Sequence, residues 1–356
     1  MEKKARLISV MNLQKPDRPP ILGGWLSSPD AIQQICRISE GEYWQDPKYW
    51  LVQAEKALGS DGMMDALVPI HRGEFRVMDV HSLEERAQYS SIEMVVDEIM
   101  AMPDPEEIRS SFNEEAAYAE FIVGFKQMQA LLGDMLWAPA DWDVIPLALR
   151  YHRYGYENAL TLPLLFPEVH SRMMRIAAEK GRQRSILHAR AMREGIQAKC
   201  FLTGEDLCGQ QGPMISPAFL RKEYWPLVEY AIEPLLEAGA RLIWHCDGNV
   251  RPVLDDVLAC GFAGFQGFQS ECGVTIDLIS QLKTQRGDPL IVFGPISVTT
   301  LLPFGTPQDV RAEVRRAMEV CRDTVSLIYF TSSSINPDVP LDNILAFWDE
   351  VLKSHW

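Results

Sequence analysis

The sequence predicts one α/β domain over residues 1–356, folded as a distorted (β/α)8 barrel (TIM barrel) with an N-terminal elaboration. From about residue 115, short apolar runs alternate with longer amphipathic segments, as strands and helices do in parallel α/β folds. No clear linker divides the chain. The runner-up is a doubly wound open sheet, but no G-x-G-x-x-G or G-x-x-x-x-G-K-[ST] pattern follows a predicted strand, so nucleotide binding has no support.

The first third of the chain carries the less regular elements. A first strand is predicted over residues 19–25, P-P-I-L-G-G-W, and a second over 63–69. The spacing of apolar residues over 47–59 is typical of a helix. Residues 71–113 are rich in charge and weakly periodic, and we interpret them as an elaboration on the barrel.

The rest of the chain is more regular. A helix is predicted over 115–132, a strand over 135–139, and helical segments over 144–195 with breaks near Pro163 and Pro167. Later strands are predicted at 198–203, 242–244, 262–268, 290–293 and 326–330, and later helices at 216–238, 251–260, 275–284, 307–321 and 341–352.

Composition narrows the classes of function. Asp and Glu outnumber Lys and Arg by 49 to 34, for a net charge of -15, which argues against a nucleic-acid or anionic-membrane partner. The seven cysteines never occur as C-x-x-C, so we expect reduced thiols, with neither a disulfide framework nor a zinc ribbon. No apolar run approaches the roughly 20 residues needed to span a bilayer, so we expect a cytoplasmic protein.

The strongest candidate for a site is the stretch 240–249, A-R-L-I-W-H-C-D-G-N. Polar chemistry begins there at the end of an apolar strand, and ligands bind at the carboxyl ends of parallel strands. His245 and Asp247 could therefore serve as metal ligands or proton carriers. The alternative is a capped strand end, in which Asp247 and Asn249 shape the turn around Gly248.

Further polar and aromatic residues follow the other predicted strands. This collection is richer in Trp, acid and amide than a structural rim requires, although a Trp is more often core and paired acids often cap helices. Its members are Trp25, Asp61 or Asp65, Trp137, Asp141, Trp142, Glu205, Asp206, Gln266, Gln269 and residues 332–334.

Several motifs in order resemble one known family. They are P-P-I-L-G-G-W, G-E-D-L-C-G-Q-Q-G-P-M-I-S-P, H-C-D-G-N-V, L-L-P-F-G-T-P-Q-D-V and S-S-I-N-P-D-V-P-L-D-N-I. Together they look like the uroporphyrinogen decarboxylase superfamily, most clearly over residues 198–352. That superfamily includes cofactor-free decarboxylases and methyltransferases that serve corrinoid proteins, on a distorted (β/α)8 barrel.

Departures from the decarboxylase pattern favour the methyltransferase branch. Decarboxylases of this superfamily carry a motif similar to R-Q-A-G-R after the first strand, and its arginines hold the carboxylates of the porphyrinogen. This chain has G-W-L-S-S at the corresponding place. The family histidine before the final Pro-Asp segment corresponds to Ser333, while a pyrrole-binding aspartate corresponds to Asp65. Trp and Ser cannot replace bidentate guanidinium recognition of carboxylates.

The resemblance also implies a metal. Coenzyme M methyltransferases of this superfamily hold zinc with H-x-C and a distant Cys, which here become His245-Cys246-Asp247 and Ser333. Enzymes of anaerobic O-demethylation carry two glutamates upstream of a histidine as zinc ligands, an order similar to Glu205, Glu223 and His245, with Asp247 an alternative to Glu223. Such a nitrogen and oxygen site suits zinc as a Lewis acid.

The resemblance therefore predicts a methyltransferase that moves a methyl group from a small donor, such as an aryl methyl ether, to the cobalt of a separate corrinoid protein. No D-x-H-x-x-G corrinoid-binding pattern is present. The alternatives are a cofactor-free decarboxylase that uses Asp65 or Asp61 on a smaller acid, and a non-enzymatic binding barrel. A homodimer is also possible.

The predicted site residues fall into three groups. The predicted catalytic residues are Glu205, His245 and Asp247, and the predicted metal ligands are these three and Glu223. The predicted substrate-binding residues are Trp25, Asp65, Trp137, Trp142, Gln266 and Ser333, with Trp244 a further aromatic candidate.

Overall fold

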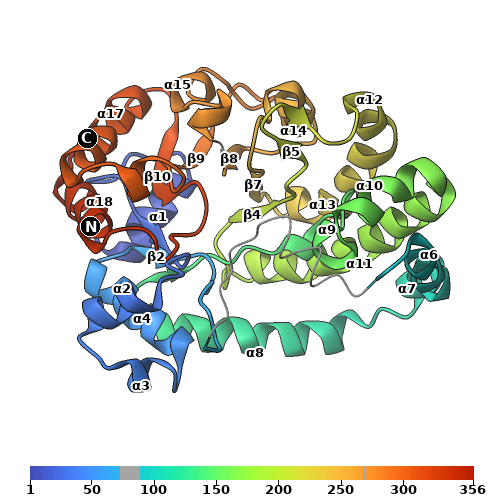
Figure 1. Ribbon diagram of the computed structural model, residues 1–356, viewed down its shortest axis with the longest axis horizontal. Helices are drawn as coiled ribbons and strands as arrows, with labels where there is room; N and C mark the ends of the chain where they lie inside the picture. Colours follow the sequence, from blue (N-terminus) through green and yellow to red (C-terminus); the bar gives the residue numbers. More distant parts are fainter. Residues whose placement is uncertain (73–88, 268) are drawn as a thin grey trace.

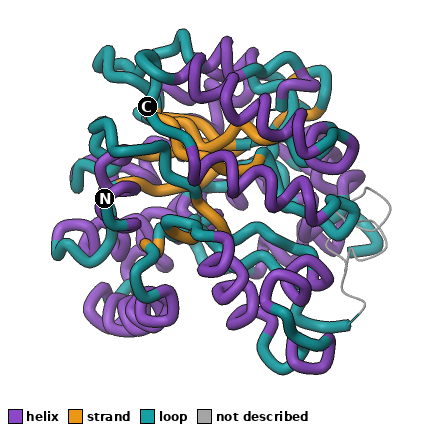
Figure 2. Tube along the Cα trace, turned by 90° about the vertical axis from the view of Figure 1, so that its left-hand side faces the viewer, coloured by secondary structure: helices purple, strands orange, loops and turns teal. Residues whose placement is uncertain are grey.

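The computed structural model describes residues 1–72, 89–267 and 269–356 (Figure 1). Strands gather in the middle of the molecule and helices surround them (Figure 2). Within the described residues, eight parallel strands line the centre: β1 (Leu22–Gly23), β2 (Gly62–Met63), β3 (Leu136–Trp137), β4 (Cys200–Gly204), β7 (Arg241–His245), β8 (Gly264–Gln266), β9 (Ile291–Ile296) and β10 (Ser326–Thr331).

Single bridges close these strands into a ring. Hydrogen bonds order them as β1-β2-β3 and as β10-β9-β8-β7-β4. The parallel bridge Ile21–Tyr329 joins β1 to β10, and the parallel bridge Ala140–Leu202 joins β3 to β4. The predicted (β/α)8 barrel is confirmed, and its distortion lies at the three two-residue strands β1, β2 and β3.

Seventeen helices are described around the ring. They are α1 (Lys3–Met11), α2 (Pro29–Cys36), α3 (Glu40–Tyr43), α4 (Pro47–Leu58), α6 (Ile92–Ala101), α7 (Pro105–Ser110), α8 (Glu114–Leu132), α9 (Tyr151–Tyr154), α10 (Tyr156–Leu165), α11 (Pro167–Arg193), α12 (Pro217–Phe219), α13 (Trp225–Glu237), α14 (Leu254–Ala259), α15 (Ile276–Ile279), α16 (Leu301–Phe304), α17 (Pro307–Cys321) and α18 (Leu341–Lys353). Short 3-10 turns η1 (Trp142–Val144), η3 (Arg251–Val253) and η4 (Ser270–Cys272), a π turn η2 (Leu220–Tyr224) and the hairpin β5 (Cys208–Gly209)–β6 (Gly212–Pro213) complete the description.

Some predicted boundaries are wrong. Residues 64–69 are not a strand: Met64 donates its main-chain N–H to Gly23 and Leu67 donates to Gly24, so the chain bends over β1 instead of extending β2. Of the helix predicted over 275–284, only α15 forms. Within the predicted elaboration 71–113, α6 and α7 are described, whereas residues 73–88 lie outside the described residues, as does residue 268 at the end of a predicted strand.

Alternation along the strands divides the core into two layers. On β7, Ile243 packs inside the barrel with Leu22, Leu202 and Phe293, whereas its neighbours Leu242 and Trp244 pack outward in the large cluster shared with the helices. Successive strand residues point to opposite faces. His245 therefore returns to the inner face, at the carboxyl end of β7.

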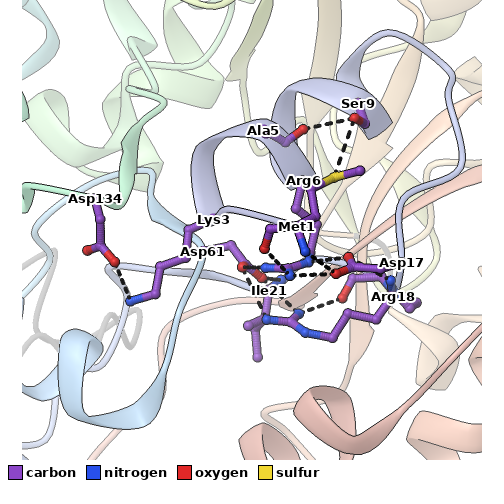
Figure 3. A network of polar contacts seen from close by, with 11 residues as sticks. Met1, Lys3, Ala5, Arg6, Ser9, Asp17, Arg18, Ile21, Asp61 and Asp134 are labelled. Carbon is purple, nitrogen blue, oxygen red and sulfur yellow. Dashed lines mark hydrogen bonds and ion pairs between the residues drawn. The ribbon is translucent and has the colours of Figure 1, made fainter.

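A buried ion network closes the opposite, amino-terminal end of the barrel (Figure 3). Asp61, directly before β2, is fully buried and accepts from the guanidinium of Arg6 at 2.5 Å and of Arg18 at 2.9 Å. It also accepts from the main-chain N–H of Ile21 at 3.0 Å. Arg6 lies on α1 and makes a second pair with Asp17. Asp61, a candidate acid in the decarboxylase alternative, thus joins α1 to the first two strands at the end away from the strand C-termini.

Candidate active site at the barrel mouth

His245 lies at the carboxyl end of β7 and packs against two indole rings, which also contact each other with centroids 6.2 Å apart. Trp25, two residues after β1, meets the imidazole edge to face with ring centroids 5.8 Å apart. Trp142, the first residue of η1, does the same at 5.1 Å. Only 8% of the surface of His245 and 4% of that of Trp25 is exposed. The imidazole is therefore one of three mutually packed aromatic rings at the barrel mouth.

A carboxylate faces the Nε2 atom of this ring, and a second carboxylate lies nearby. His245 Nε2 lies 3.3 Å from Oδ1 of Asp206, which follows β4. The same Asp206 oxygen accepts the main-chain N–H of Asp247 at 2.9 Å. In the part of the chain that the structure describes, Asp206, His245 and Asp247 form the one group of acidic, His or Cys side chains that could hold a metal ion, with ligand atoms within 4.8 Å of one another.

The electrostatics of the three groups are coupled. Burial favours neutral His245, but the Asp206 carboxylate outweighs it and raises the pKa of His245 to about 9. Burial likewise opposes ionisation of Asp206, yet His245 lowers the pKa of that carboxyl to about 2. Burial and then Asp206 raise the pKa of Asp247 to about 8. At neutral pH the metal-free cluster thus holds an ion pair of His245 and Asp206 beside a protonated Asp247.

Glu205 and Glu223 lie outside this group. Both carboxylate oxygens of Glu205 accept main-chain hydrogen bonds, from Ala148 at 2.8 Å and from Leu149 at 2.6 Å. Burial raises the pKa of Glu205 to about 7. Glu223 lies in η2, about one-third exposed, and pairs with Lys222 at 2.8 Å. Glu205 thus holds the loop before α9. The residue of this strand end that joins His245 and Asp247 is Asp206.

The remaining predicted substrate-binding residues are divided. Trp142 packs with Trp25 against the inner core, whereas Trp137 and Trp244 pack outward between strands and helices. Oδ1 of Asp65, in the loop after β2, accepts the main-chain N–H of Ala66 at 2.8 Å. Ser333 is partly exposed in the loop after β10.

Gln266, also predicted to bind substrate, instead contacts His245 from below. Its surface is 1% exposed, and its side-chain oxygen faces His245 Nδ1. Its amide nitrogen donates to the main-chain oxygens of Thr331 and Ser332. Gln266 therefore ties His245 to the end of β10.

A second polar cluster on the rim was not predicted from the sequence. Glu271, in η4, accepts from the hydroxyls of Ser297, Thr299 and Thr300. Burial opposes its ionisation, but these hydrogen bonds lower the pKa of Glu271 to about 2. Its charge contributes to the raised pKa of Asp247. The mouth thus presents acids and aromatic rings.

The closed ring of eight strands, with its polar cluster at their carboxyl ends, defines the architecture of a (β/α)8-barrel enzyme. The model of the family described as uroporphyrinogen decarboxylase (URO-D) matches residues 156–354, more than half of the chain. The chain belongs to this family of enzymes.

Comparison with solved structures agrees on the fold. A methyltransferase from Methanosarcina mazei is similar, with a TM-score of 0.61 and 15% sequence identity over 99% of each chain. No curated protein matches the sequence. None of the helices in the described ranges combines the length and apolar character that crossing a bilayer demands.

Proposed function

We propose that this protein is a methyltransferase that moves a methyl group from a small donor, possible donors including aryl methyl ethers, to the cobalt of a corrinoid carried by a separate protein. The observation that carries the proposal is the cluster of Asp206, His245 and Asp247, whose imidazole packs against the rings of Trp25 and Trp142. Flat apolar walls suit an aromatic donor, because indole rings contribute area and stacking. By the resemblance to the decarboxylases, Trp25 also occupies the region where those enzymes carry the arginines that bind carboxylates.

The cluster suits zinc. It offers an imidazole nitrogen and carboxylate oxygens, which are established zinc ligands. Oδ1 of Asp247 is buried without a hydrogen-bond partner, an arrangement that is costly unless a cation or donor completes it. His245 Nε2, Asp206 and Asp247 would hold the ion, and bound zinc would supply Lewis acidity toward an ether or hydroxyl oxygen.

The side chains of His245 and Asp247 can donate a proton to the ether oxygen that leaves with the ring. When the C–O bond of an ether breaks, the methyl carbon joins the cobalt, and the departing phenoxide needs a proton or a positive charge. In the metal-free site His245 and Asp247 both carry protons at neutral pH, since their pKa values are raised to about 9 and about 8, and donation of one of these protons gives the phenol as product. Metal ligands are deprotonated, so bound zinc would supply the positive charge in place of these protons. Trp25 and Trp142 keep the donor's ring beside these side chains and exclude water.

The acceptor belongs to a partner. The corrinoid supplies the cobalt nucleophile, and the open carboxyl end of the barrel is the face on which a corrinoid protein would deliver it. The similarity in fold to a methyltransferase is consistent with this assignment.

The test uses the zinc-loaded protein, reduced cob(I)alamin in place of the partner's corrinoid, and 2-methoxyphenol as the probe donor. We expect the absorbance of methylcobalamin to appear together with 1,2-dihydroxybenzene in equal amount. Elemental analysis should find about one zinc per chain, the stoichiometry of a single site. If no methoxylated aromatic is demethylated while a carboxylated one, such as 2-hydroxybenzoate, releases CO2 without metal, the protein is a decarboxylase. If neither reaction occurs, the remaining alternative is a non-enzymatic barrel that binds a ligand.

A further inference from the structure

We infer that Gln266 and Gly267 are positioning residues, which hold the His245 imidazole with its proton on Nδ1 and present Nε2 to whatever binds at the barrel mouth. The inference deepens the proposed function, because it concerns how the same site presents its reactive atom. It rests on the directions of hydrogen bonds around Gln266 and on a steric contact of Gly267 with the imidazole.

The direction of the Gln266 amide is set by two main-chain carbonyls. Its Nε2 lies 2.9 Å from the oxygen of Thr331 and 3.2 Å from that of Ser332. Carbonyl oxygens only accept hydrogen bonds, so the NH2 group must face them. The amide oxygen is then turned toward His245 Nδ1. Because an amide oxygen cannot donate, Nδ1 must carry the proton of this hydrogen bond.

This proton fixes the role of the other ring nitrogen. With hydrogen on Nδ1, a neutral ring has its lone pair on Nε2, the atom that lies 3.3 Å from Asp206. Metal-binding histidines are oriented in the same way, by an acceptor on their second nitrogen. Here the acceptor lies on β8 and is itself anchored to the end of β10, so residues of three barrel strands define the ring's place.

Gly267 adds a steric element. A Cβ built at this position would lie 2.5 Å from Nδ1 of His245 and 3.2 Å from Oδ1 of Asp247. Its φ of +86° is also unfavourable for residues with a side chain. The main chain of Gly267 therefore packs directly against two members of the cluster. A side chain there would displace the ring from its present position.

A matched pair of variants separates positioning from stability. Gln266→Met keeps length and removes the amide. The control is Gln197→Met, because Gln197 is also buried, its oxygen faces Nδ1 of His188 at 2.9 Å, and the other nitrogen of His188 faces Asp141. In both sites a histidine has a glutamine oxygen at Nδ1 and an aspartate carboxylate at Nε2. One stands at the barrel mouth and the other on α11, behind β4.

The readout is binding of Co²⁺, whose visible spectrum reports coordination. We expect Gln266→Met to weaken Co²⁺ binding by roughly 10–100-fold, the usual effect of losing an outer hydrogen bond to a ligating histidine, and to change the spectrum. Gln197→Met should leave both unchanged. Unaltered affinity and spectrum in Gln266→Met would overturn the role assigned to Gln266.

The glycine has a control of its own. Gly267→Ala should abolish Co²⁺ binding, whereas Gly287→Ala has nearly the same backbone strain, with φ +82°, and meets no atom within 4 Å. Equal Co²⁺ affinity in the two alanine variants would contradict the steric part of the inference. If Gln266→Met fails to fold, the comparison of Gly267→Ala with Gly287→Ala still tests whether the position of the imidazole controls Co²⁺ binding.

A metal-free readout keeps this inference distinct from the proposed function. In protein labelled with ¹⁵N-histidine, at a pH where His245 is neutral, the ring nitrogen shifts should show hydrogen on Nδ1. Gln266→Met should shift the proton to Nε2, the tautomer that predominates when nothing holds Nδ1, while Gln197→Met leaves His245 unchanged. If the unsubstituted protein binds no metal but shows this pattern, the metal-assisted function fails and the positioning role stands. A neutral His245 with hydrogen on Nε2 in the unsubstituted protein would refute the positioning role alone.

Discussion

Trp25 and His245 touch across the barrel mouth, with ring centroids 5.8 Å apart, although Trp25 follows the first strand of the eight-stranded ring and His245 ends the fifth. Strands so placed lie on opposite sides of the barrel. Trp25 also packs on Phe330 of β10 at 4.9 Å and on Trp142 at 6.2 Å. The mouth is therefore narrow, and a ligand that reaches His245 also meets an indole.

Replacement of His245 by Ala should remove the metal without unfolding the barrel. It deletes the only nitrogen ligand of the cluster and leaves the Gln266 oxygen without its donor, at a cost of about 1–3 kcal/mol. Elemental analysis should show zinc falling from about one per chain, the stoichiometry of a single site, to near zero. His188→Ala is the control, because His188 is equally buried but lies on α11. Full zinc occupancy in His245→Ala would remove this residue from the ligand set.

Glu205→Gln should lower stability and leave zinc in place. A carboxylate accepts two main-chain hydrogen bonds here, from Ala148 and Leu149, whereas an amide offers one oxygen. One N–H then faces an NH2 group, which we expect to cost about 1–3 kcal/mol in urea unfolding. Glu223→Gln, on a partly exposed side chain, should change stability by less than about 0.5 kcal/mol. Should zinc and turnover fall together in Glu205→Gln, Glu205 would return to the ligand set.

Much of this arrangement could be predicted from the sequence. Alternating apolar and amphipathic segments predict the barrel, and the polar turn after an apolar strand predicts His245 and Asp247 as neighbours. The alternation of side chains along β4 also indicated that Asp206, and not Glu205, faces the inside of the barrel. Cys200 and Leu202 point into the barrel, so a residue an even number of positions further along shares their face, and Glu205 does not.

Other features depend on contacts that no local pattern contains. The outward packing of Trp137 and the role of Gln266 follow from the register between strands, because Gln266 pairs opposite His245 and reaches the end of β10. The shortness of β1, β2 and β3 is likewise invisible in apolar runs, since their residues are buried whether or not they form a ladder. Asp61 resembled a strand-end acid, and its partners Arg6 and Arg18 are distant in sequence.

Asp61→Asn should destabilise the barrel and spare the site. It would leave the buried guanidinium groups of Arg6 and Arg18 without their shared counter-charge. Removal of one partner from a buried pair costs about 3–5 kcal/mol, which should appear as a lower urea midpoint with zinc content unchanged. Asp17→Asn, on a carboxylate that is 42% exposed, should cost much less. Equal losses in the two variants would mean that Asp61 is not central to the network.

Glu55→Gln should change how stability depends on pH. Glu55 is fully buried on α4, where it accepts from Gly24 N–H and Ser60 Oγ, and burial raises its pKa from 4.5 to about 7 despite these bonds. The stabilising effect of the protonated carboxyl is complete below about pH 4.5 and is lost as pH rises through about 7, a difference of about 3 kcal/mol. The glutamine variant lacks this loss. Unfolding free energies at about pH 5 and about pH 8 should therefore converge or cross between the two proteins, and parallel pH profiles would contradict the prediction.

Trp25 should determine how tightly the methyl donor binds. An indole beside His245 contacts donor and transition state alike, so its loss should raise KM with little change in kcat, the pattern of uniform binding. Loss of stacking worth about 0.5–1.5 kcal/mol corresponds to an increase of up to about tenfold in KM.

The experiment compares Trp25→Ala with Trp137→Phe in the demethylation of 2-methoxyphenol. Trp25 is almost fully buried and packs on Phe330, so Trp25→Leu, which leaves a smaller void, serves if the alanine variant does not fold. Trp137 packs outward, away from the mouth, and its substitution should lower stability without altering KM. A fall in kcat at constant KM in Trp25→Ala would instead assign the indole to the chemical step, because an interaction made only in the transition state reduces kcat and kcat/KM together.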